Sequence, residues 1–253
     1  YAGHADVVGG GDELAWKHDP FSGVVEDGWI FGRGSVDHKG PIAASLGALR
    51  AIIQSGIELA GDIVFIVPVD EECGSYVGTK HLLKEGILYG DMGIYASAGF
   101  LNQVIISCSG ALSFEIKVAG RASHSGYPKS GINAIKNAAK LVIALEEMQF
   151  ERVNPFWSPE GDDALKPNRT GSISVGQIWG GETMNVIPGA CNFRGNRRLI
   201  PNETVDEAKQ QIESVIEKLS AEDPELNAEI DYLSGVHGIN TSSEAEVVKI
   251  VEV

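Results

Sequence analysis

The sequence predicts an α/β protein in which a small α+β domain is inserted into a larger domain. Two observations predict this organisation. Before residue 110, apolar strand-like runs alternate with segments of helical periodicity, which is typical of an α/β domain. From Gly110 onward the expected elements follow the order β-α-β-β-α-β, which is typical of a ferredoxin-like arrangement.

The first part of the chain contributes helices and apolar strands. Residues 41–53 carry apolar side chains three and four positions apart behind Pro41, which predicts a helix. The continuous apolar run 63–67 predicts a buried parallel strand. A short helix is expected at 79–84 and another strand at 92–96. The first His motif should follow a strand, so we expect that N-terminal strand to begin before Tyr1.

The second part alternates apolar and polar side chains at 112–118, which predicts a strand with one solvent-facing side. The remaining elements expected there are an amphipathic helix at 133–148, strands at 171–175 and 190–200, a helix at 205–219 capped by Asn202 or Thr204, and a strand at 228–232. We therefore expect a first domain at 1–109, an inserted domain at 110–236, and the start of a return to the first domain at 237–253.

Composition narrows the classes of partner. The chain has 253 residues, a net charge of -15 and an isoelectric point of about 4.8, so nucleic acid and anionic membrane are not expected as partners. No apolar run is long enough to span a membrane, and residues 1–8 do not read as a signal peptide. The widely spaced Cys73, Cys108 and Cys191 predict free thiols and a cytoplasmic location.

Three clusters of His and carboxylate residues are candidates for metal ligands and for a catalytic base. They are Gly3-His4-Ala5-Asp6, then Gly34-Ser35-Val36-Asp37-His38-Lys39-Gly40, then Asp70-Glu71-Glu72-Cys73-Gly74. Zinc takes imidazole nitrogen and carboxylate oxygen, and a catalytic zinc site leaves one position open for water. Of two adjacent glutamates, one can bind a metal while its neighbour takes a proton from water. A single His or Glu pair is more often a surface feature, but the ordered set predicts the first half of a two-metal hydrolase site.

These motifs, with others further along the chain, resemble the M20 family of metallopeptidases and amidohydrolases. The further motifs are Trp16 with Asp19-Pro20-Phe21, Asp27-Gly28 before Gly32-Arg33-Gly34, Gly120-Arg121-Ala122-Ser123-His124-Ser125, Gly131-Ile132-Asn133, Asn185-Val186-Ile187-Pro188, and Arg198 before Pro201. The resemblance implies a zinc-peptidase-like catalytic domain with an inserted ferredoxin-like lid and dimerisation domain. It also implies two zinc ions per active site, with cobalt or manganese as alternatives.

By resemblance, the first three clusters supply the metal site. His4 binds one zinc ion, Glu72 binds the other, and Asp37 bridges both. Glu71 is the general base, and Asp6 orients His4. His38 stands where the family often has Met, so we expect it near the metals but pointing away from them.

By resemblance, the inserted domain supplies substrate contacts. His124 polarises the scissile carbonyl in the partner subunit's site, and Asn185 and Arg198 contact the substrate. The residues themselves leave other interpretations open. His124 can be a turn residue, Arg198 a surface cation beside Arg197, and Asn185 the cap of a turn before Pro188.

Two departures from the family pattern bear on the metal site. Ser97 aligns with a position where the family has Glu or Asp, and serine is a poor zinc ligand. Asp91 replaces it only in a different register. The family's last ligand is a His beyond the end of this chain.

The function expected from these residues is hydrolysis of the amide bond of a small N-acyl amino acid by a homodimer. The first alternative is a dipeptidase or carboxypeptidase of the same family. The second is a non-catalytic relative with a degraded metal site, in which the lid acts as a binding or dimerisation module.

Overall fold

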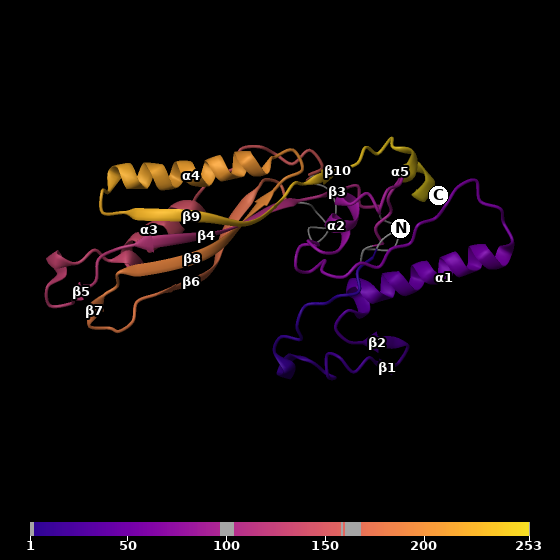
Figure 1. Ribbon diagram of the computed structural model, residues 1–253, viewed down its shortest axis with the longest axis horizontal. Coiled ribbons are helices and arrows are strands. Elements are labelled where there is room, and N and C mark those ends of the chain that lie inside the picture. The colour runs from indigo at the N-terminus through magenta and orange to yellow at the C-terminus, as the bar shows by residue number, and fades with distance from the viewer. Residues whose placement is uncertain (1–2, 97–103, 158, 160–167, 253) are drawn as a thin grey trace. The chain divides into compact units, whose positions relative to one another are not determined.

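The computed structural model describes residues 3–96, 104–157, 159 and 168–252. Its internal contacts divide the chain into two compact units. Unit 1 comprises Tyr1–Val104 and Glu244–Val253, and unit 2 comprises Ile105–Ser243. Figure 1 labels their elements.

Unit 2 is built on an antiparallel four-stranded sheet with the strand order β6-β8-β4-β9. The elements follow one another as β4 (Gly110–Ala119), α3 (Ala134–Glu146), β6 (Ser172–Gly180), β8 (Ala190–Leu199), α4 (Val205–Glu222) and β9 (Asn227–Val236). This is the predicted β-α-β-β-α-β order, with the first and third strands at the centre of the sheet. The ferredoxin-like expectation is therefore confirmed.

Both helices of unit 2 begin at side-chain caps. The Asn133 carboxamide oxygen accepts the backbone N–H of Lys136 at 3.0 Å at the start of α3. At the start of α4, Thr204 and Glu207 form a reciprocal capping box, so Thr204 rather than Asn202 is the cap. These contacts satisfy N–H groups that the first turn of a helix leaves without partners.

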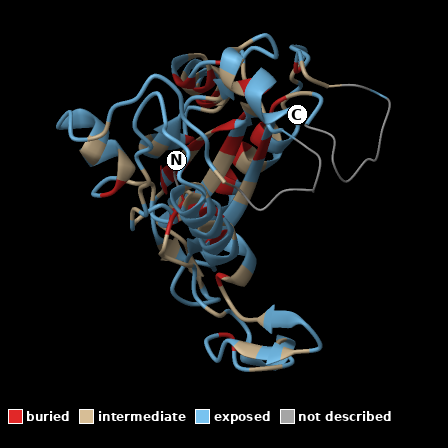
Figure 2. Ribbon diagram, turned by 90° about the vertical axis from the view of Figure 1, so that its right-hand side faces the viewer, coloured by how far each residue is buried: buried red, intermediate tan, exposed pale blue. Residues whose placement is uncertain are grey.

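The core of unit 2 lies between the sheet and the two helices. Its side chains are fully or almost fully buried, and they come from β4, β8, α3 and α4: Leu112, Phe114, Ile116, Val118, Phe193, Ala138, Leu141, Leu145, Ala208 and Ile212. Since α3 and α4 share one cluster, both helices cover the same face of the sheet. Figure 2 shows the buried residues gathered along these strands.

The opposite face of the sheet carries two ion pairs. Glu115 on β4 pairs with Arg194 on β8 at 2.7 Å, and Lys117 pairs with Asp231 on β9 at 2.5 Å. This is the strand with one solvent-facing side that the alternation at 112–118 predicts.

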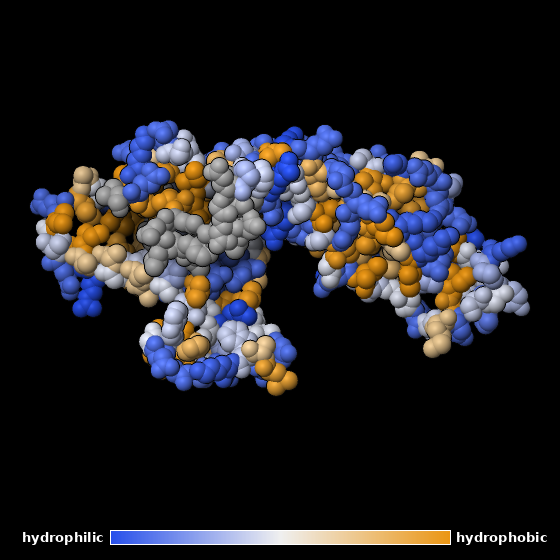
Figure 3. All heavy atoms as spheres, turned by 180° about the vertical axis from the view of Figure 1, so that it is seen from behind, coloured by the Kyte–Doolittle hydropathy of each residue, from blue (hydrophilic) through white to orange (hydrophobic). Residues whose placement is uncertain are grey.

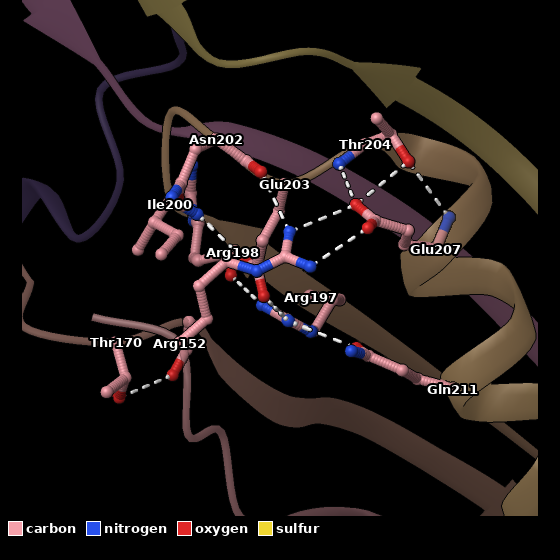
Figure 4. Close-up of polar contacts among 11 residues, drawn as sticks. Arg152, Thr170, Arg197, Arg198, Ile200, Asn202, Glu203, Thr204, Glu207 and Gln211 are labelled. Atoms are coloured by element: carbon pink, nitrogen blue, oxygen red, sulfur yellow. Dashed lines mark hydrogen bonds and ion pairs between the residues drawn. The ribbon is translucent and has the colours of Figure 1, made fainter. Parts of the chain in front are cut away.

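A buried ion pair lies inside unit 2. The Arg197 guanidinium is completely buried, donates to Glu203 at 2.7 Å and to Gln211 at 3.1 Å, and lies 3.9 Å from the centre of the Phe150 ring. Glu203 also accepts the backbone N–H of Ile200 at 3.0 Å. Figure 4 shows how this network joins the end of β8 to α4.

Short elements extend unit 2 at its ends. β5 (Ser123–His124) pairs with β7 (Val186–Ile187), and β3 (Ser107–Cys108) pairs with β10 (Ile239–Asn240). A single turn of 3-10 helix, η3 (Pro128–Ser130), follows β5.

Unit 1 has less regular structure. Its elements are η1 (Glu13–Ala15), β1 (Val24–Glu26), β2 (Trp29–Phe31), the helical turn η2 (Ser35–Lys39), α1 (Gly40–Ser55), α2 (Thr79–Lys84) and α5 (Glu246–Val251). The helices predicted at 41–53 and 79–84 are confirmed. None of the described helices is long and apolar enough to cross a membrane.

The strands predicted at 63–67 and 92–96 are corrected by the structure. Each range keeps only one bridge position, at Ile66 and Tyr95. Gly3 and Ala5 donate their backbone N–H groups to the carbonyls of Ile66 and Pro68. The physical reason is incomplete burial. A parallel strand is stable when both of its faces are buried, and most of the apolar side chains in these two ranges are exposed.

Apolar side chains stay at the surface throughout unit 1. On α1, Leu46 and Ile53 are exposed, and on the β1–β2 hairpin Val25, Trp29 and Ile30 are exposed. Figure 3 shows apolar residues, coloured orange, at the surface of this face of the molecule.

Candidate metal centre

Three segments of unit 1 bring acidic and imidazole groups together. His4 lies in the irregular segment that pairs with residues 66–68, Asp37 lies in η2, and Glu71 and Glu72 lie in the turn before α2. One nitrogen or oxygen atom from each of His4, Asp37 and Glu72 lies within 4.8 Å of the others, which is a geometry that can hold a metal ion. An imidazole nitrogen and two carboxylate oxygens are donors that suit zinc.

The η2 turn gives Asp37 its position. Gly34, at the start of the turn, has a left-handed φ of 83°. A side chain there would also meet Val7 and Lys39, so the turn requires glycine. Within the turn Asp37 departs from helical φ/ψ and is largely exposed, so its carboxylate is accessible to an ion.

The His4 ring is held at both nitrogens. Nδ1 lies 3.0 Å from the main-chain oxygen of Asp6 and 3.3 Å from its Oδ1, and Nε2 lies 3.0 Å from Oδ1 of Asp37. A carbonyl can only accept, so Nδ1 carries a proton. If the ring holds only this one proton, the lone pair of Nε2 faces the Asp37 carboxylate. The repulsion between this lone pair and the carboxylate is relieved when Nε2 takes a second proton or when a cation lies between the two groups.

The pKa of His4 agrees with this geometry. Burial alone would lower it, but the hydrogen bonds to Asp37 and to the Asp6 carbonyl, with the charge of Glu71, raise it overall. The neutral ring that a metal requires is therefore reached by displacing a proton, so metal binding competes with protonation.

Asp6 connects two of the segments. Its Oδ2 accepts the backbone N–H of Glu72 at 3.0 Å, while its main-chain oxygen contacts His4. Burial tends to raise the pKa of Asp6, but the N–H groups of Glu72 and Glu71 outweigh this effect and lower it. Asp6 thus stays ionised and fixes the turn beside the imidazole.

Glu71 lies next to the group without belonging to it. Its Oε2 is 3.9 Å from Nε2 of His4. Burial, together with the negative charges of Glu72, Asp37 and Asp6, raises the pKa of Glu71 despite the opposing effect of His4. A carboxylate with a raised pKa accepts a proton more readily near neutral pH.

Two residues to which the sequence analysis assigns no role also belong to this site. Lys39 Nζ donates to the carbonyl of Ala5 at 2.8 Å and so ties the η2 turn to the His4 segment. Tyr95 stacks on His38, and burial, together with nearby carboxylates, raises its pKa to about 12. The Asp-x-Lys-Gly motif signals Lys39, whereas nothing local in the sequence signals Tyr95.

The predicted substrate residues all lie in unit 2, in two separate places. Ser125 donates its backbone N–H to the Asn185 carbonyl at 2.9 Å, and β5 with His124 pairs with β7, so His124 and Asn185 are neighbours. Arg198 pairs with Ala111 and Ser172 near the opposite end of the sheet. All three side chains are exposed. Ser97 lies outside the described residues.

The chain is similar to known proteins over most of its length. A family model described as a peptidase dimerisation domain matches residues 106–224. The chain is 33% identical over 244 residues to a succinyl-diaminopimelate desuccinylase of Alkalilimnicola ehrlichii, covering 93% of this chain and 61% of that protein. It is 31% identical over 249 residues to an acetylornithine deacetylase of Myxococcus xanthus, covering 98% of this chain and 62% of that protein.

A solved structure shares the fold. The M20 family metallo-carboxypeptidase of Sulfolobus solfataricus matches with a TM-score of 0.79 and 21% identity, over 98% of this chain and 66% of that chain. The chain therefore spans less than two thirds of the length of the two curated relatives and about two thirds of this structure.

Proposed function

This chain belongs to the M20 family of metallopeptidases, and from that premise we propose that it is a metal-dependent hydrolase that removes the acyl group from a small N-acyl amino acid. The observation that carries the proposal is the group formed by His4, Asp37 and Glu72 with Glu71 beside it. The names of both curated relatives describe removal of an acyl group from an amino acid, which favours a deacylase over a dipeptidase or carboxypeptidase.

His4, Asp37 and Glu72 would hold the metal. We propose zinc, with cobalt or manganese as alternatives, and Asp37 as the ligand shared by two ions. When bound, the metal would polarise the substrate carbonyl and lower the pKa of water. Glu72 is already positioned for this role, because its backbone N–H donates to Asp6.

Glu71 would act as the general base and then as the acid. It takes a proton from the attacking water as the water oxygen bonds to the carbonyl carbon. It then returns that proton to the amine nitrogen as the C–N bond breaks. Its raised pKa suits both steps, since a proton that is accepted must also be released.

His124 would donate a hydrogen bond to the developing oxyanion. The backbone N–H of Gly126 donates to Nδ1 of His124 at 3.0 Å, so Nδ1 is unprotonated and Nε2 carries the ring proton. The exposed ring thus presents a donor at Nε2, which is what an oxyanion requires.

The substrate residues of one lid would serve two active sites. His124 and Asn185 lie beyond the Ala190 end of β8, and Arg198 lies near its other end. Eight residues of strand span roughly 26 Å, so one small substrate cannot touch both places within a single chain. A homodimer formed through the lid, with His124 and Asn185 acting in the partner's site and Arg198 binding a substrate carboxylate, meets this condition.

The remaining expectations stay proposals. They are the domain boundaries 1–109, 110–236 and 237–253, and a cytoplasmic location. The location is supported by the three unpaired cysteines Cys73, Cys108 and Cys191.

A substitution at the base tests the proposed activity. Glu71→Gln keeps the size and removes the proton acceptor, so we expect at least a hundredfold loss of turnover with zinc binding retained. Glu58→Gln, at an exposed loop position, is the matched control. The assay uses N-acetyl and N-succinyl amino acids beside dipeptides. Full turnover in Glu71→Gln would refute the base, preference for dipeptides would favour the peptidase, and inactivity on every substrate would favour the non-catalytic relative.

Mixed dimers test the shared lid. Glu71→Gln and His124→Ala homodimers are each expected to be inactive, and subunit exchange should restore about a quarter of wild-type turnover, since half of the dimers become mixed and each mixed dimer has one intact site. No recovery after verified exchange would place His124 in its own chain's site.

A further inference from the structure

His38 is the most deeply buried aromatic side chain beside the candidate metal centre, and its ring makes no polar contact. It is 1% exposed, and among the described residues neither ring nitrogen has a hydrogen-bond partner. It directly follows Asp37. A polar atom buried without a hydrogen-bond partner destabilises the folded state, so its presence requires a physical explanation.

The ring of His38 lies between two other rings. Its centroid is 5.0 Å from that of His4 with 21° between the planes, and 4.7 Å from that of Tyr95 with 27° between the planes. The other side of the pocket is backbone, because a side chain at Gly3 would come within 2.7 Å of Nδ1 of His38. His38 therefore contacts His4 with the face of its ring.

The contacts of His4 leave one motion open. Both of its nitrogens are bonded, Nδ1 to the Asp6 carbonyl and Nε2 to Asp37. These contacts fix the direction of the ring within its own plane and resist tilting out of that plane less strongly. A ring packed on the face of His4 adds a direct restraint against that tilt.

We infer that His38 is a positioning residue that fixes the ring plane of the proposed metal ligand His4 by stacking on it, with Tyr95 supporting His38 from behind. This inference rests on the proposed function only in taking His4 as a ligand. His38 is not itself a ligand here, because the donor atoms that approach one another come from His4, Asp37 and Glu72. Groups that orient a ligand typically change metal affinity 10–100-fold when they are removed.

Two substitutions separate the ring face from the ring nitrogens. His38→Phe keeps a flat face and removes both nitrogens, whereas His38→Leu removes the flat face. His81→Leu makes the same chemical change at an exposed position of α2 and is the matched control. Tyr95→Ala removes the support behind His38 and should have a smaller effect of the same kind. Circular dichroism establishes that each variant is folded.

The first readout is made without metal. The proton resonances of the His4 ring, assigned by their absence in His4→Gln, should be displaced upfield by the stacked ring in the wild type, in His38→Phe and in His81→Leu. The displacement should vanish in His38→Leu. The second readout is zinc affinity measured by chelator competition, with the visible spectrum of the cobalt form. We expect an affinity about tenfold weaker and an altered spectrum in His38→Leu only.

Three results decide the inference. A His38→Leu variant with wild-type resonances and wild-type zinc affinity would overturn it, and so would a His38→Phe variant as weak as His38→Leu, since that would assign the effect to the nitrogens. A wild-type protein that shows the upfield His4 resonances but binds no zinc would refute the proposed function, while the hold of His38 on the His4 ring would still be supported.

Discussion

The two units bury opposite kinds of side chain. Unit 2 encloses a continuous apolar cluster between its sheet and the helices α3 and α4. In unit 1, by contrast, the largest fully buried side chains of the described residues are those of His4 and His38, while the apolar side chains of α1 and of the β1–β2 hairpin are exposed. Regular structure and packing therefore stabilise unit 2, whereas polar and stacking contacts around the candidate metal centre hold the segments of unit 1 together.

This difference shows which contacts bring the donor atoms of the candidate metal centre together in this structure. Asp6, Asp37 and Lys39 each bond to a segment distant in sequence, and these contacts bring the donor atoms together. A bound ion would add to the same set of contacts, because ligand binding stabilises the state that binds.

The largest effect is expected at the buried charge of unit 2. Arg197→Ala leaves the buried Glu203 carboxylate without its cationic partner, so we expect a loss of about 3–5 kcal/mol in the free energy of unfolding. Arg194→Ala removes a half-exposed arginine from the open face of the same strand and should cost at most about 1 kcal/mol. Denaturant unfolding of both variants checks this. Equal losses would mean that the interior of unit 2 is as adaptable as its surface.

The next effect compares apolar side chains of the two units directly. Leu141→Ala on α3 removes a side chain that is 0% exposed and should cost about 2–5 kcal/mol. Ile53→Ala on α1 removes a side chain that is 79% exposed and should change stability by no more than about 0.5 kcal/mol. Hydrogen exchange, followed peptide by peptide, reports each unit separately. A large loss for Ile53→Ala would show that the face of α1 is covered in solution and would remove the contrast between the units.

The smallest effect concerns the surface of unit 2. The hydrogen bond from Arg152, and then those from Thr204, lower the pKa of Glu207 from its ordinary value of 4.5 to about 2. As pH falls below 4.5, Glu207 becomes protonated in the unfolded chain but stays ionised in the folded chain. Acid therefore favours unfolding until about pH 2, where the folded chain is protonated as well. We therefore expect wild type to lose more stability than Glu207→Gln across that window. Parallel curves of urea midpoint against pH would contradict this contribution.

The sequence predicts the elements that local patterns specify. The helix at Thr79–Lys84, the capped helices α3 and α4, and the order of elements along unit 2 follow from periodicity, capping residues and alternation. The strands expected at 63–67 and 92–96 could not be settled in this way. An apolar run shows that a segment is hydrophobic enough to be buried. Whether it forms a strand depends on packing and pairing partners far away in the sequence.

The same division holds for the site. Motif order predicts that His4, Asp37 and Glu72 approach one another, and the structure brings them together. The stacking of His38 on His4, and of Tyr95 on His38, depends on how distant segments fold together, so no local sequence pattern predicts it. The distance between Arg198 and the neighbours His124 and Asn185 likewise becomes visible only once the strands are paired.

The measurement that tests the central claim most directly is zinc titration of the protein beside its Asp37→Asn variant, followed by calorimetry. The account predicts tight zinc binding in the wild type and its loss in Asp37→Asn, because Asp37 contacts His4 and belongs to the donor group with Glu72. Equal zinc binding by both proteins, or none by the wild type, would contradict a metal centre at His4, Asp37 and Glu72.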